Sequence, residues 1–372
     1  MQAPPEGMVV FRTAQFHPRG VRILFEAEQP ATLNLVRRVV SELIASALFG
    51  GAVLVAYGWA VEEIRRLITR GALPFYETDD ATTLDGWYDA ALVGIEPTSE
   101  WTCWCIQFAQ THADRLLVDL DGLQAVGSEV LRGSDPRWHG LVTSAEVVPV
   151  WRSRDLIDPG QFLISGMLVE PPEPRVRHEV RERLGVSKDT RVLLYSGLVS
   201  SDFPDHPDIQ LSTLDSVLGG VRTIAQAYTE RDFCCLIRPH PRAAAEHPLM
   251  RSRIPHDLPP NMRAVWDPSS VTFDECVLAA DVVACMPTSS FVVQAPYYGR
   301  LALVLALRER ATGQIFDALF TSHEVALLRH MEYVKLARNE RVIARALRDA
   351  RPKPRLKADG GARVAQFLLG HS

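Results

Sequence analysis

Lysine is scarce in this chain. Only Lys188, Lys335, Lys353 and Lys357 are lysines among its 40 basic residues, and the other 36 are arginines. The arginine excess fits either a GC-rich coding bias or a demand for bidentate binding of phosphate and carboxylate, and composition alone does not choose. The net charge of −5 is the opposite of what a duplex nucleic-acid binder shows, so we expect no nucleic-acid partner.

Targeting and membrane-spanning segments are also missing. The N-terminus has no basic stretch followed by an apolar one, and Gly50 and Gly51 interrupt the longest uncharged apolar run, Leu43–Ala56. We therefore expect no signal peptide and no membrane span. The six cysteines have neither zinc-knuckle spacing nor the density of a disulfide scaffold, so we expect buried free thiols and a cytoplasmic location.

Three common cofactor motifs are absent as well. The sequence contains no GxGxxG after its first strand, no GxxxxGK[ST] and no HExxH. The dinucleotide fingerprint, the P-loop and the zinc-protease helix are thereby unsupported, and we expect no cofactor and no metal.

The chain does contain an alternation of strand-like and helix-like segments. Its 372 residues suggest two domains, and 47% hydrophobic content allows a sizeable core. The main predicted strands are Val21–Ala27, Ala52–Tyr57, Ala90–Ile95, Arg115–Leu120, Leu163–Gly166, Val192–Ser196, Phe233–Arg238, Asn261–Trp266, Asp281–Met286 and Leu301–Leu307, with helical segments between most of them. This alternation favours parallel sheets covered by helices on both faces.

A proline-rich stretch, Glu170–Pro174, separates two similar halves. We expect domains over residues 1–170 and 171–372, the second ending in a long helix over His323–Arg348. Ligands of open α/β sheets bind outside the carboxyl ends of the strands. Residues that directly follow strands are therefore the first candidates for a site.

The strand ending at Arg238 leads directly into Pro-His-Pro-Arg. The prolines, Pro241 among them, fix the backbone on either side of His240, and Arg238 and Arg242 supply fork-shaped donors suited to phosphate. A bound phosphate favours the cationic imidazole, so His240 would donate to the anion or protonate a leaving group. A proline-stiffened loop with a solvent-facing histidine is the structural alternative.

Small hydroxyl side chains stand between a strand and a helix at Thr288, Ser289 and Ser290. Hydroxyls and free backbone N–H groups at a helix N-terminus bind anions, although a plain helix cap uses the same residues. Gly197 follows another strand of this half and lets a ligand approach closely. Together with His240 on the same sheet edge, these residues predict a nucleotide-phosphate site.

Acidic residues follow two strands of the N-terminal half. Asp119 and Asp121 share one face at the end of a strand, and Glu26 and Glu28 follow the first strand. A carboxylate in such a place can act as the general base on an acceptor hydroxyl. Turn formation, helix capping and solvation are the structural alternatives.

Three of these motifs occur in the order found in a known group of enzymes. Asp-Gly at Asp121, His-Pro at His240 and Ser-Ser at Ser289 resemble the motifs of bacterial sialyltransferases and Kdo transferases, which have the GT-B fold. The resemblance implies two Rossmann-like α/β domains facing across a cleft. It further implies Asp121 as the base, His240 as stabiliser of the leaving phosphate, and phosphate binding by Ser289 and Ser290. Gln294 stands where many transferases have a ribose-binding glutamate, and an amide can hold a ribose too.

The implied reaction is metal-independent transfer of a sugar from a nucleotide-activated donor, of the CMP-sialic acid or CMP-Kdo type, to a hydroxyl. The acceptor would be a glycan, a lipid-linked molecule or a small molecule. Leu120 stands where those families often have a second acid, which leaves Glu26, Glu28 and Asp119 as alternative bases.

Other functions remain open. Residues Thr288–Gly299 also resemble the Ser-Ser segment of CDP-glycerol polymerising enzymes, and UDP-sugar 2-epimerases share the fold. A non-catalytic module that binds a nucleotide or a partner is a further alternative.

Two remaining features concern surface and core. Lys335–Lys357 carries nine basic residues against Glu340 and Asp349, which predicts either a solvated helix face or peripheral contact with anionic lipid. Trp101 and Trp104 are three residues apart on a predicted helix, so we expect them in the core rather than on an acceptor platform.

Overall fold

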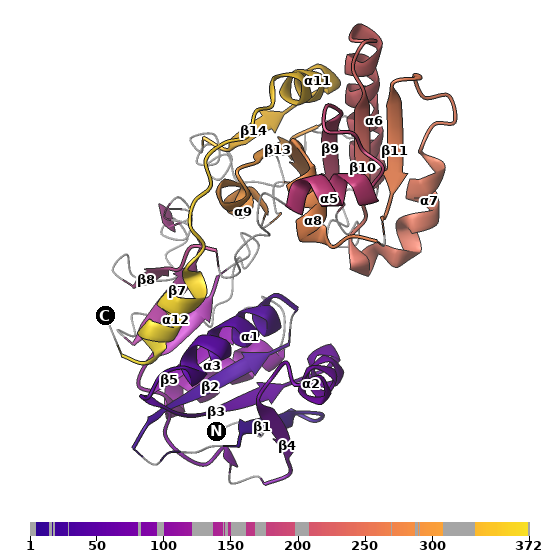
Figure 1. The fold of residues 1–372 in the computed structure, drawn as a ribbon. Coiled ribbons are helices and arrows are strands. Elements are labelled where there is room, and N and C mark those ends of the chain that lie inside the picture. The colour runs from indigo at the N-terminus through magenta and orange to yellow at the C-terminus, as the bar shows by residue number, and fades with distance from the viewer. Residues whose placement is uncertain are drawn as a thin grey trace. The chain divides into compact units, whose positions relative to one another are not determined.

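The computed structural model divides the chain into two compact units (Figure 1). Unit 1 comprises Met1–Val169 and Ala358–Ser372, and unit 2 comprises Glu170–Lys357. The structure describes residues 5–14, 17, 19–28, 30–80, 83–94, 100–120, 137–143, 145, 148–149, 161–167, 176–197, 208–268, 270–286, 289, 291–307 and 332–370.

Unit 1 is built on a mixed sheet with the strand order β4-β1-β3-β2-β5-β6-β7-β8. Strand β1 pairs antiparallel with β3 and β4, and every other pairing is parallel. Its elements are β1 (Val9–Thr13), β2 (Val21–Ala27), α1 (Pro30–Ile44), β3 (Phe49–Ala56), α2 (Trp59–Thr69), β4 (Phe75–Thr78), β5 (Ala90–Gly94), α3 (Glu100–His112), β6 (Leu116–Asp119), β7 (Trp138–Val142), β8 (Phe162–Ile164) and α12 (Gly360–Leu368).

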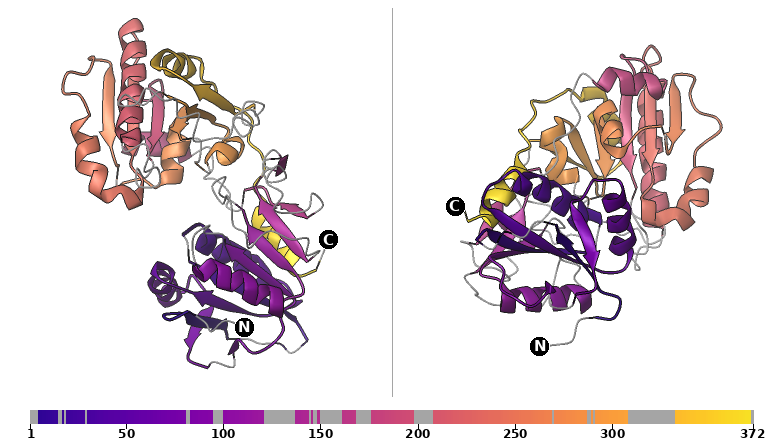
Figure 2. Two further views of the ribbon diagram at one scale, coloured as in Figure 1. Left: turned by 180° about the vertical axis from the view of Figure 1, so that it is seen from behind. Right: turned by 60° about the horizontal axis from the view of Figure 1, so that its bottom comes forward.

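Alternate side chains of β2 face two different layers of helices in unit 1. Phe25 belongs to the buried cluster that joins the sheet to α1, α2 and α12. Glu26, the next residue, points to the opposite face, where it contacts Trp101 of α3. Figure 2 shows α1 and α3 on opposite faces of the sheet.

Unit 2 is built on a fully parallel sheet with the order β11-β10-β9-β12-β13-β14. Its elements are α5 (Val176–Arg183), β9 (Arg191–Ser196), α6 (Ile209–Ala227), β10 (Phe233–Arg238), the 3₁₀ helix η5 (Pro241–Glu246), α7 (His247–Ser252), β11 (Met262–Trp266), α8 (Phe273–Ala279), β12 (Val282–Cys285), α9 (Phe291–Tyr298), β13 (Leu301–Leu305), β14 (Val334–Ala337) and α11 (Glu340–Asp349).

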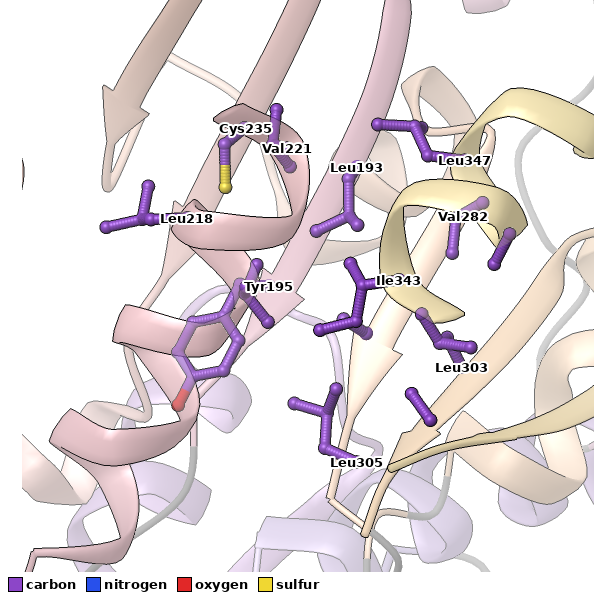
Figure 3. Close-up of a cluster of buried hydrophobic side chains, with 14 of the residues drawn as sticks. Leu193, Tyr195, Leu218, Val221, Cys235, Val282, Leu303, Leu305, Ile343 and Leu347 are labelled. Carbon is purple, nitrogen blue, oxygen red and sulfur yellow. The ribbon is translucent and has the colours of Figure 1, made fainter. Parts of the chain in front are cut away.

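The core of unit 2 lies where the sheet meets α6 and α11. Figure 3 shows Leu193 and Tyr195 of β9 together with Leu218 of α6 and Ile343 of α11 in this cluster. The central strands are apolar over nearly their whole length because helices cover both faces of a parallel sheet. The predicted α/β class, with a parallel-stranded sheet in each half, is confirmed.

The C-terminal part of the chain differs from the prediction in two ways. The single helix expected over 323–348 is wrong, because Val334–Ala337 pairs with β13 as a strand. Asn339 then starts α11 by accepting a hydrogen bond from the Val342 N–H at 3.1 Å. The basic residues expected on one helix are therefore divided among a strand, a helix and an extended stretch.

The second difference is that the last residues of the chain belong to unit 1 rather than to the second domain. Helix α12 packs against α1, and its Val364 and Leu368 are fully buried. Arg115, just before β6, donates to the carbonyl oxygens of Phe367 at 2.7 Å and Leu368 at 3.0 Å. An apolar helix face and a capped C-terminus thus hold this segment on unit 1.

The antiparallel strands β1 and β4 and the helix α7 were not predicted either. His247 and Pro248 begin α7, and proline is tolerated in the first turn of a helix. The six cysteines are free thiols, five of them buried, as expected.

Among the described helices, none combines the length and apolarity needed to cross a bilayer.

The placement of α12 predicts which unit depends on it. Leu368→Ala should destabilise the protein by about 2–5 kcal/mol, because it removes a fully buried side chain. Hydrogen exchange should accelerate in α1 and β2 of unit 1. The matched variant Leu347→Ala, equally buried in α11, should accelerate exchange in α6 instead. Faster exchange of unit 2 alone in Leu368→Ala would contradict the assignment.

Candidate functional site

A buried carboxylate lies at the carboxyl end of β2 in unit 1. Glu26 is 2% exposed, and its two oxygens accept different hydrogen bonds. Oε2 accepts from the Gly94 N–H at 2.8 Å, and Oε1 accepts from Trp101 Nε1–H at 3.0 Å. Both donors are neutral, so the described hydrogen bonds hold the carboxyl without placing a cation on it.

Burial raises the pKa of Glu26 from its ordinary value of 4.5 to about 7. The hydrogen bonds from Trp101 and Gly94 act in the opposite direction, and the nearby charge of Glu28 adds to the increase. A carboxyl with this pKa is present in both protonation states near neutral pH. It can therefore accept a proton from one group and return it to another.

Gly94 makes room for this carboxyl at the end of β5. A Cβ atom there would lie 2.3 Å from Thr32 Oγ1 and 3.1 Å from Glu26 Oε2, so no larger residue fits without displacement. In the sheet register Gly94 pairs with Asp119, the last residue of β6, which is 8% exposed. Two of the predicted alternative bases thus lie at the carboxyl ends of the strands on either side of β5, because Glu26 is the penultimate residue of β2 and Asp119 is the last of β6. Glu28 follows β2 and is partly exposed.

A ladder of stacked rings runs from this edge along α3. Ring centroids are 5.3 Å apart between Tyr57 and Trp101, 5.6 Å between Trp101 and Trp104, and 5.1 Å between Trp104 and Phe108. The prediction that Trp101 and Trp104 lie in the core is confirmed, at 2% and 6% exposure. The role of Trp101 as donor to Glu26 was missed, because sequence spacing does not show that two elements 75 residues apart meet.

In unit 2, Gly197 and the His240 segment lie side by side. The Gly197 N–H donates to the Arg238 carbonyl at 2.8 Å. A Cβ at Gly197 would lie 2.9 Å from both His240 N and Pro239 Cα. The His240 carbonyl accepts from the Ala243 N–H at 2.9 Å and from His247 Nε2 at 3.3 Å. The backbone of the histidine is therefore fixed on both sides at the carboxyl end of the sheet.

Arg238 holds the loop after β11 by hydrogen bonds that the sequence did not predict. Its Nη1 donates to the carbonyl oxygens of Pro268 at 3.0 Å and Val271 at 3.1 Å, and it lies 3.6 Å from a carboxylate oxygen of Asp267. Asp267 has a φ of 33°, the only positive φ of a non-glycine among the described residues. Part of the donor capacity of Arg238 thus holds a strained turn, and phosphate binding by this residue stays a prediction.

Ser289 forms local hydrogen bonds before α9. Its N–H donates to the Met286 carbonyl at 2.9 Å, and its Oγ accepts from the Phe291 N–H at 3.3 Å. The Ser289 amide therefore donates within the chain, and phosphate binding by Ser289 stays a prediction. Gln294 lies partly exposed in α9, and its role stays a prediction.

Several predicted residues lie outside the described part of the chain. These are Asp121, Thr288 and Ser290, together with the side chains of Pro241 and Arg242. Their assigned roles stay predictions. Among the described residues, no group of three or more His, Cys, Asp and Glu side chains is arranged to hold a metal ion.

Comparison with known proteins gives structural likeness only. No protein-family model matches the sequence, and no curated protein matches it. Solved structures do match over nearly the whole chain. The S. aureus MnaA–UDP structure has a TM-score of 0.59 at 10% identity and covers 95% of this chain and 98% of its own.

Two further structures extend this likeness. The Methanocaldococcus jannaschii UDP-GlcNAc 2-epimerase, in complex with UDP-GlcNAc and UDP, has a TM-score of 0.54 at 10% identity and covers 94% of this chain and 99% of its own. Acinetobacter baumannii MurG has the same TM-score, identity and coverage. The chain therefore has the fold shared by these proteins, as predicted.

The buried Glu26 carboxyl predicts a pH-dependent stability. Its pKa lies above the ordinary 4.5, so the folded protein retains a proton that the unfolded chain releases between about pH 4.5 and about 7. Stability from this group is present at low pH and is lost as pH rises through that window, by about 3 kcal/mol. In Glu26→Gln this loss should vanish, as measured by urea unfolding from about pH 5 to about pH 8. Glu62→Gln, at an exposed carboxyl, should keep the wild-type profile, and parallel profiles for wild type and Glu26→Gln would contradict the assignment.

The close approach at Gly197 predicts a cost for any side chain there. Gly197→Ala should lower the free energy of unfolding by about 1–3 kcal/mol, because the added methyl meets backbone atoms that no rotamer change can move. Gly219→Ala in α6 is the control. Its methyl meets only the flexible carboxylate of Glu340, and alanine favours the helix. Denaturant unfolding of both variants checks this, and equal stabilities would show that the 239–240 backbone yields freely.

Proposed function

We propose that this chain is a nucleotide-sugar glycosyltransferase. In this proposal unit 2 binds the donor nucleotide at the carboxyl ends of β9, β10 and β12, and Glu26 of unit 1 is the proton acceptor. The single observation that carries the proposal is the Glu26 carboxyl, which is buried at the carboxyl end of β2 among the parallel strands of the unit 1 sheet and has a pKa of about 7.

The proposed reaction needs two groups from the protein, a proton acceptor and a donor to the leaving phosphate. The acceptor hydroxyl attacks the anomeric carbon, a new C–O bond forms, and the bond from that carbon to the phosphate oxygen breaks. The bonding electrons leave with the nucleotide, and the hydroxyl proton passes to the Glu26 carboxylate. The imidazole of His240 would donate to the phosphate as negative charge grows on it, which lowers the barrier electrostatically. Asp121, Asp119 and Glu28 are the alternative bases.

For the donor we propose a pyrimidine nucleotide. The motif resemblance supports CMP, in a metal-independent reaction. The likeness to structures that hold UDP and UDP-GlcNAc supports UDP. Each of these nucleotides has a pyrimidine base and a ribose that carries phosphate. Gln294 is the proposed contact to the ribose. The acceptor is proposed to be a hydroxyl of a glycan, a lipid-linked molecule or a small molecule.

A UDP-sugar 2-epimerase is the second candidate. The likeness to the S. aureus MnaA–UDP structure and to the Methanocaldococcus jannaschii epimerase favours it. In that reaction a titratable carboxyl such as Glu26 would exchange a proton with the sugar carbon rather than with an acceptor. Turnover of UDP-GlcNAc without any acceptor, with solvent deuterium entering the sugar, would establish the epimerase.

The nucleotide site is tested by ligand-induced stabilisation. A ligand that binds only the folded state stabilises it by about 2.7 kcal/mol at a hundred times its Kd, which should raise Tm by about 5 °C or more. We expect this increase with UDP or CMP and not with GDP, and we expect His240→Ala to remove most of it. His178→Ala, at an exposed histidine of α5, should retain the full increase. Stabilisation by GDP alone would overturn the pyrimidine donor, whereas stabilisation by no nucleotide would overturn the transferase proposal and favour a non-catalytic module.

A further inference from the structure

Trp59 is an exposed aromatic residue at the functional edge of unit 1. It opens α2 and is 54% exposed, while Ala60, Val61, Ile64 and Leu67 of the same helix are buried. The apolar stripe of α2 that packs on the core therefore does not include Trp59. Burial of such a side chain by a ligand would remove a large apolar area from water and so favour binding.

Trp59 follows the strand that pairs with the strand of Glu26, at the same carboxyl edge of the sheet. Ala56, the last residue of β3, pairs in register with Ala27 of β2, and the Tyr57 N–H donates to the Ala27 carbonyl at 3.4 Å. Trp59 comes three residues after Ala56, so its backbone lies at most about 11 Å further on.

A stacked pair of rings joins Glu26 to Tyr57, which stands two residues before Trp59. Glu26 accepts from Trp101, and Tyr57 stacks on Trp101 with an interplanar angle of 19°. Tyr57 is partly exposed, unlike Trp101. A carboxylate, a half-exposed tyrosine and an exposed tryptophan thus follow one another along the edge formed by β2 and β3.

We propose that Trp59, with Tyr57 beside it, is the stacking platform for a hexopyranose ring of the acceptor. A pyranose has one face of C–H groups, which pack on an aromatic ring, and a rim of hydroxyls, which need polar partners such as the edge carboxylates. Aromatic side chains with a nearby carboxylate match this division. The inference rests on the proposed transferase function and names the substrate class of its acceptor.

The chain contains a matched control. Trp87 is 51% exposed, almost as much as Trp59, but it lies before β5 at the amino end of the parallel strands. Its Nε1–H donates to Asp114 at 2.8 Å. Ligands are not expected at that edge, so a general affinity of exposed tryptophans for sugars would affect both residues equally.

The experiment uses the full chain labelled with 5-fluorotryptophan, with the ¹⁹F signals of Trp59 and Trp87 assigned from Trp59→Phe and Trp87→Phe. Methyl glycosides of glucose, galactose, mannose and N-acetylglucosamine are titrated separately. We expect at least one to shift the Trp59 signal and leave the Trp87 signal in place. Trp59→Ala should weaken that binding at least about tenfold, whereas Trp59→Phe should retain most of it.

Nucleotide binding separates failure of this proposal from failure of the transferase function. Trp59→Ala should keep the Tm increase with UDP or CMP. If that increase is present but no glycoside shifts the Trp59 signal, the platform is wrong and the donor site stands. A Trp59 signal that responds to the nucleotide instead would overturn the acceptor assignment. If no nucleotide stabilises the protein, the transferase proposal fails, whatever the glycosides do.

Discussion

Parallel strand pairing is the constraint on which the candidate site depends. Parallel strands bring their carboxyl ends to one edge, so residues far apart in the sequence become neighbours when each follows a strand. In unit 1 this edge collects Glu26, Gly94 and Asp119 from β2, β5 and β6. In unit 2 it brings Gly197 against the backbone of His240. The chemistry proposed for both units thus follows from strand direction and order.

Burial then gives these groups their properties. Glu26 accepts from two neutral donors, Trp101 and the Gly94 N–H, and loss of solvation outweighs these two hydrogen bonds, so its pKa rises. The neighbouring residues are correspondingly restricted. Gly94 has no space for a side chain, and Trp101 is fixed between two rings while its N–H reaches the carboxyl. Burial of this edge therefore accounts both for the raised pKa of Glu26 and for the restricted space around it.

The sequence predicts well those features that depend on neighbouring residues. The strand Phe233–Arg238 follows from an unbroken apolar run, and the positions of Glu26 and His240 follow from the ends of such runs. Contacts over long separations were not predictable in this way. Arg238 contacts carbonyls 30 residues away, and Val334–Ala337 becomes a strand because β13 is available to pair with it. In both cases the contact depends on how the strands are arranged in the sheet, which local sequence does not show.

The return of α12 to unit 1 makes the order of synthesis matter. The strands of unit 1 precede unit 2 in the chain, yet the cluster around α1 lacks Val364 and Leu368 until all of unit 2 has been translated. The apolar side chains of α1 that pack against α12 therefore have no partner there while unit 2 is being made. The core of unit 1 cannot be completed before the whole of unit 2 has been synthesised, and exposed apolar surface of this kind favours aggregation.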